Sequence, residues 1–221
     1  MRKLINPVPP NLPLGTEQYE RRFMDQYSNV LRLYFNQLNN FTGSISSNTG
    51  GALLGFPFIS ATDSDTQYAS GDNTATIVKW NTLEDGTAFT LNADYTATAT
   101  LTGIYKITYS LQLANNDNAA HNAIVWLRVN GVDVTNSTTI FTLPARKSAG
   151  VPAYVCGYSE VVFRLYAGDS VGLWWGTDKA ATSGGVVGNY IYAQAAQTSP
   201  MAYPATPSAL GSITFVSSIL A

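Results

Sequence analysis

The chain has 221 residues, which is enough for one β domain of ordinary size with an appendage and too few for two large domains. Charged residues make up 12% of the chain and the net charge is -2, so nucleic acid and anionic membranes are not expected as partners. One cysteine, Cys156, excludes an internal disulfide, and one histidine, His121, excludes zinc sites that need a second histidine or several cysteines. We expect no metal and no cofactor.

Residues 1–15 predict an extended arm, because four prolines favour polyproline geometry and leave the segment without a core of its own. The same prolines interrupt the apolar run that a secretion signal needs, and no stretch reaches the roughly 18 apolar residues of a membrane span. Simple disorder is the ordinary state of such a terminus. The apolar residues among the prolines favour docking on another surface, through Leu4, Ile5, Pro7, Val8, Pro9, Leu12 and Leu14.

Residues 16–41 predict an amphipathic helix, with Thr16 as N-cap, Glu17 and Glu20 in the first turn, and Gly43 as the stop. About three heptads are too short for a stable isolated helix. The apolar seam therefore requires a partner, and self-association or docking on a neighbouring protein is favoured over packing on the β domain of the same chain. The seam consists of Met24, Tyr27, Leu31, Tyr34, Leu38 and Phe41, broadened by Phe23, Val30 and Phe35.

Residues 42–54 are rich in Gly, Ser and Asn and predict a linker. Residues 55–221 predict about ten short strands, which favours an antiparallel β-sandwich. Alternating apolar and polar residues mark strands at 95–102 and 105–113, and Asn130-Gly131 predicts a type I′ hairpin turn.

Two predicted strands, 123–129 and 171–175, are apolar on both faces. A sheet with one solvated face does not show this pattern, so the helix or another subunit is expected to cover the second face. A curled edge or a long loop is the alternative. We predict a subunit interface at Ile124, Trp126 and Trp174, because exposed indoles are favoured at interfaces.

Residues that could perform catalysis are sparse, and no enzymatic activity is expected. His121 is the only candidate base for a nucleophile, and the polar residues around it predict a solvated loop histidine. Asp63-Ser64-Asp65 and Glu84-Asp85-Gly86 are interpreted as turns.

Three segments resemble the signature strands of C1q/TNF-like domains: Gly103 to Tyr109, Leu165 to Trp175 and Gly211 to Ser217. The resemblance covers about residues 55–221, and its most specific element is the turn Ala167-Gly168-Asp169 before an apolar strand. It implies a mainly β, antiparallel jelly-roll sandwich that is usually trimeric, here preceded by a Pro-rich arm and one amphipathic helix.

The front end is similar to virion structural proteins of tailed bacteriophages. The similarity rests on the proline arm, the segment Glu20 to Tyr27, the segment Leu31 to Asn40 and the Gly/Ser/Asn linker. It implies a homotrimeric capsid decoration or cement protein, made in the host cytoplasm and located on the capsid exterior. Its partners would be itself and the major capsid protein or other virion proteins. A tail-fibre or receptor-binding tip that recognises a host-surface glycan or protein is the alternative.

Overall fold

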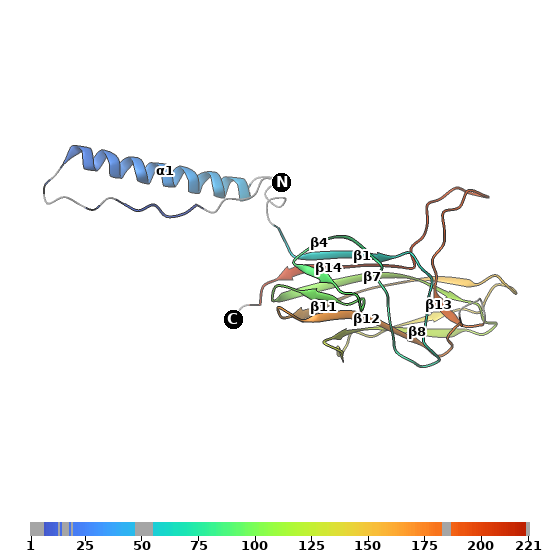
Figure 1. Cartoon of the computed structure of the whole chain (residues 1–221). Coiled ribbons are helices and arrows are strands. Elements are labelled where there is room, and N and C mark those ends of the chain that lie inside the picture. The colour runs from blue at the N-terminus through green and yellow to red at the C-terminus, as the bar shows by residue number, and fades with distance from the viewer. Residues whose placement is uncertain are drawn as a thin grey trace. The chain divides into compact units, whose positions relative to one another are not determined.

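The computed structural model describes residues 7–12, 14, 18, 20–46, 55–182 and 187–219, and the chain divides into two compact units (Figure 1). We call residues 1–55 the helix unit and residues 56–221 the β unit. The predicted docking residues Leu4 and Ile5 and the predicted N-cap Thr16 lie outside the described residues. Within the described residues, no helix is both long and apolar enough to cross a membrane.

The helix α1 spans Arg21–Ser46, so the predicted range of 16–41 is wrong at both ends: Glu20, predicted in the first turn, precedes α1, and the helix continues five residues beyond Phe41. Gly43 does not stop the helix, because one glycine inside a helix costs only about 1 kcal/mol. The side chains around it also bond within the helix: the hydroxyls of Thr42 and Ser46 donate to the carbonyls of Leu38 and Thr42 at 2.9 Å each. Residues 42–46, predicted as linker, therefore form the last turn of α1.

The β unit is a sandwich of two antiparallel sheets (Figure 1). The first sheet, sheet A, has the strand order β2 (Gln67–Tyr68), β13 (Asn189–Ile191), β7 (Gly103–Asn115), β14 (Ala209–Ser217), β1 (Phe58–Asp63), β4 (Thr82–Thr87), and β11 (Ala153–Leu165) also pairs with β7. The second sheet, sheet B, has the order β10 (Thr139–Leu143), β8 (His121–Val129), β12 (Ser170–Thr177), β6 (Ala97–Ala99), β5 (Phe89–Leu91), with β3 (Thr76–Ile77) on β12 and β9 (Val132–Asp133) on β8.

The connections from β6 to β7, β7 to β8, β10 to β11 and β11 to β12 each pass from one sheet to the other. This alternation is that of a double-sheet jelly roll. The predicted mainly β, antiparallel jelly-roll sandwich with one helix is therefore confirmed.

The core lies between the two sheets and follows the alternation of the strands. In β7 the odd-numbered residues from Tyr105 to Leu113 are buried and the even-numbered ones are half-buried up to Gln112. From sheet B, Val125 and Leu127 of β8 and Trp175 of β12 are fully buried in the same cluster. The alternation of apolar and polar residues in this segment thus predicts both the strand and the side of it that faces the core.

The predicted turn at Asn130-Gly131 is confirmed: both residues have positive φ, 52° and 79°, as a type I′ turn requires. The predicted turn at Glu84-Asp85-Gly86 is wrong, because these residues lie within β4. β4 is an edge strand of sheet A and all six of its residues are exposed. Its sequence therefore lacks the alternation of apolar and polar residues that marks a half-buried strand. The strand predicted at 95–102 is reduced to β6, because Tyr95 adopts a positive φ of 66° in the preceding turn.

Candidate interaction surfaces

The predicted apolar seam occupies one face of α1. Its residues recur at helical spacing, and none of the 26 residues of α1 is buried in the structure described. Phe23 stacks on Tyr27 with ring centroids 6.2 Å apart, while Leu38 and Phe35 are exposed. The structure therefore brings together the five predicted helix interface residues on one side of α1, namely Phe23, Tyr27, Leu31, Tyr34 and Leu38.

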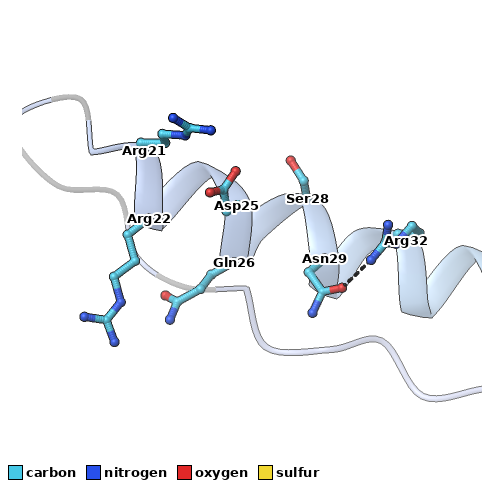
Figure 2. A pocket seen from close by; sticks show the side chains of 7 residues that line it. All are labelled: Arg21, Arg22, Asp25, Gln26, Ser28, Asn29 and Arg32. Atoms are coloured by element: carbon cyan, nitrogen blue, oxygen red, sulfur yellow. Dashed lines mark hydrogen bonds between the residues drawn. The ribbon is translucent and has the colours of Figure 1, made fainter.

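The opposite face of α1 is polar and carries three arginines. An open groove of about 900 Å³ follows its first three turns (Figure 2) and is lined by Arg21, Arg22, Asp25, Gln26, Ser28, Asn29 and Arg32. The Arg32 guanidinium donates to the Asn29 side-chain oxygen at 2.9 Å. This basic face was not singled out from the sequence, although a helical projection of residues 21–32 is enough to find it.

The described part of the arm exposes most of the predicted docking side chains. Pro7 is half-buried and Pro9 is exposed. The exposed fractions of Val8, Leu12 and Leu14 are 76%, 43% and 92%. These side chains are available for contact with another surface.

On the outer face of sheet B, the two predicted interface indoles are direct cross-strand neighbours: Trp126 of β8 pairs with Trp174 of β12. Arg128 covers both, with its guanidinium carbon 4.1 Å from the Trp174 ring centroid and 5.7 Å from that of Trp126. Asp133 accepts from the Trp126 indole at 2.6 Å and from Arg128 Nε at 2.5 Å. Part of the cover expected from another subunit thus comes from Arg128, and Ile124, Trp126 and Trp174 remain half-buried.

The outer face of sheet A also exposes apolar surface, and sequence reasoning missed it. Tyr154, Tyr158 and Val162 point outward from β11 with exposed fractions of 51%, 57% and 59%, and Leu210 of β14 adds to them at 42%. The outward side of β11 mixes these apolar residues with Glu160 and Arg164, so the sequence carries only a weak signal of an apolar face there.

A group of tyrosines continues this face across β2, β13 and β11. Tyr190 pairs with Tyr68, and the ring centroid of Tyr192 lies 5.2 Å from that of Tyr154 and 6.1 Å from that of Tyr190. Burial, with smaller contributions from Tyr154, Tyr192 and Tyr68, raises the pKa of Tyr190 to about 12. Tyrosines that combine ring area with a hydroxyl group are typical of protein interfaces.

The prediction of a solvated loop histidine is wrong, because His121 is the first residue of β8 and its side chain is 16% exposed. Its Nε2 lies 3.0 Å from Asp117 and its Nδ1 lies 3.5 Å from Asp178. The hydrogen bond with His121 is the main cause that lowers the pKa of Asp117. His121 therefore ties the loop after β7 to the segment after β12.

The turn predicted at Asp63-Ser64-Asp65 is confirmed by the Asp65 N–H, which donates to the Asp63 carboxylate at 2.8 Å. Burial is the largest cause that raises the pKa of Asp63. Among the residues that the structure describes, no group of three or more His, Cys, Asp or Glu is placed to hold a metal ion.

No family model matches the sequence, and no curated protein matches it. Among solved structures, the chain is similar to murine APRIL at pH 5.0, with 18% identity and a TM-score of 0.45 over 73% of this chain and 100% of that one. It is also similar to the globular domain of the zebrafish complement 1qA protein, with 16% identity and a TM-score of 0.41 over 75% of this chain and 100% of that one.

Proposed function

We propose that this protein is a non-enzymatic structural protein of a tailed-bacteriophage virion, a homotrimer that decorates the capsid exterior. The helix unit attaches the trimer to the shell and the β units project from it. The resemblance of the arm, helix and linker to virion proteins supports the phage setting. The position of His121 supports the absence of catalysis, because both of its ring nitrogens face carboxylates.

The observation that carries the proposal is the unburied seam of α1. The nine apolar side chains of the seam follow one face of a helix in which no residue is buried. Burial of apolar surface contributes about 25 cal/mol per Å², and a helix of this length gains most of its stability from such packing. Three copies packed seam to seam would bury these side chains together.

The β units supply a second contact in the trimer. The predicted residues Ile124, Trp126 and Trp174 remain one candidate. The outer face of sheet A is the second, because it exposes Tyr154, Tyr158 and Val162 without a covering side chain of the kind that Arg128 provides on sheet B. Lys106 and Glu160 on this face form an ion pair at 3.4 Å, so these two charges do not oppose the approach of another copy.

Three arms on one trimer act at high effective concentration, so that modest contacts by each arm suffice for stable attachment. Removal of residues 1–15 is expected to leave a folded trimer that no longer binds capsids. Capsid binding by this truncated trimer would remove the arm from the proposal.

The assembly is tested by sedimentation equilibrium of the full chain. The native protein is expected to have three times the 23.7 kDa chain mass. Leu31→Asp places a carboxylate in the seam and should give a monomer, whereas Asn36→Asp places one on the polar face and should leave the trimer intact. A native monomer at micromolar concentration would overturn the proposal.

The virion role is tested by quantitative mass spectrometry of purified particles. A copy number comparable to that of the shell subunits supports decoration, and only a few copies per particle supports a tail location. The receptor-binding alternative rests on the polar segments 114–122 and 177–185, which His121 and Asn122 join through their contacts with Asp178. Binding to host cells that His121→Ala reduces would favour this alternative.

A further inference from the structure

We propose that the basic face of α1, formed by Arg21, Arg22 and Arg32, docks on an acidic protein surface. This inference rests on the proposed function and names the chemistry of the partner to which the helix unit attaches. It places the attachment on the side of α1 that remains exposed when the seam is buried.

The first argument is the placement of the arginines on α1. At 3.6 residues per turn, Arg21, Arg22 and Arg32 project from the side opposite Tyr27, Leu31 and Tyr34. All three arginines are exposed and line the groove in Figure 2. Burial of the seam in a trimer therefore turns the arginines outward, where a support can contact them.

The second argument is the distribution of charge. The helix unit has five Lys and Arg against three Asp and Glu, while the β unit has seven against eleven. The chain thus combines a positive attachment unit with a negative projecting unit. Planar guanidinium groups match carboxylates in paired hydrogen bonds, which makes an acidic surface the complementary partner.

The third argument concerns Arg21 and Arg22, whose charges do not stabilise the helix; Arg32, in contrast, bonds Asn29 within it. The first turn of α1 has no acidic residue and begins with Arg21 and Arg22. Cations at this end oppose the helix macrodipole at a cost of about 0.3–1 kcal/mol each. A role in holding the helix together therefore does not account for them, and their charge is left for a partner.

The same face does not suit a nucleic acid. Three arginines with Asp25 among them offer few cations, whereas binding to nucleic acid depends on the neutralisation of many phosphates. The other lining side chains are Gln26, Ser28 and Asn29, and no aromatic ring is present among them for base stacking. Carboxylates of a protein partner can instead alternate with these amides and hydroxyls.

The test uses the full chain and a double charge reversal, Arg21→Glu with Arg22→Glu, against Lys79→Glu with Lys147→Glu, which changes two exposed cations of the β unit by the same total charge. Binding to poly-L-glutamate is measured by fluorescence anisotropy, with oligo(dT) of equal charge as the second probe. Binding to phage particles is measured by co-sedimentation. The arginine variant should lose roughly tenfold or more in affinity for both poly-L-glutamate and particles, and added salt should weaken native binding.

The outcomes separate the two proposals. Equal affinities of native protein and arginine variant for poly-L-glutamate, or tighter binding of native protein to oligo(dT), would overturn the acidic-protein inference. Loss of the trimer in the arginine variant would also overturn it, because the face would then serve assembly. Arginine-dependent binding to poly-L-glutamate without any binding to particles would support the basic face and reject capsid decoration. The helicity of the variant should not fall, which distinguishes docking from a structural role.

Discussion

The guanidinium of Arg128 lies over the ring of Trp174, with 4.1 Å between the guanidinium carbon and the ring centroid. The same side chain bonds Asp133, which also accepts from the Trp126 indole. One arginine thus shields two indoles on the outer face of sheet B, and a strand that is apolar on both faces is partly covered within its own β unit.

Replacement of Arg128 by Ala is expected to lower the free energy of unfolding by about 1–2 kcal/mol, because a cation–π contact and the packing of the side-chain stem are lost. Chemical denaturation measures this change. The tryptophan emission should also shift to longer wavelength as Trp174 becomes more exposed. Arg128→Lys keeps the charge without the planar group, so its stability and its emission wavelength should lie between those of the native protein and Arg128→Ala. Unchanged stability and emission in Arg128→Ala would show that the contact contributes nothing.

Replacement of Gly43 by Ala is expected to stabilise α1 by about 0.5–1 kcal/mol, because Gly43 lies within the helix and no atom lies within 4 Å of an added Cβ. Circular dichroism should show a higher melting temperature for the helical signal. A loss of helicity would place Gly43 at the helix end, as the sequence alone predicted.

Gly211 packs its Cα against the ring of Trp80, and an added Cβ would lie 2.6 Å from the Trp80 ring. Gly211→Ala is therefore expected to destabilise the β unit by about 1–3 kcal/mol through overpacking. Gly176→Ala is the matched control, because its nearest atom lies at an ordinary 3.5 Å. Similar unfolding midpoints for the two variants in denaturant would contradict the close contact at Trp80.

Tyr190 is expected to deprotonate near pH 12, at a higher pH than an exposed tyrosine. Because its folded-state pKa lies above the ordinary value of 10, its contribution to stability is complete below pH 10 and declines as the pH rises from 10 to 12. The difference between the alkaline absorbance titrations of native protein and Tyr190→Phe isolates this group. A difference curve centred at pH 10 would show that Tyr190 is solvated.

Local patterns in the sequence were enough to predict the helix, the hairpin turn and the main strands. The seam of α1 follows from helical spacing, and the faces of β7 follow from alternation, because both periods are set by backbone geometry within one element. The positive φ of Asn130 and Gly131 follows from the same local chemistry. The antiparallel sandwich followed from the many short strands and not from any single contact, whereas the jelly-roll topology was implied by the resemblance of three segments to C1q/TNF-like domains.

What only the tertiary structure decided depends on pairs of residues that are distant in the chain. No local pattern places Arg128 over Trp174, sets His121 between Asp117 and Asp178, or aligns Tyr68 with Tyr190 on one face of sheet A. β4 was missed because an exposed edge strand buries no side chain. Gly43 was wrongly predicted to end the helix, because the hydroxyls of Thr42 and Ser46 bond carbonyls within it. The periodicity of a sequence specifies which face of an element is apolar, whereas the packing of sheets and loops determines which of those faces is already covered.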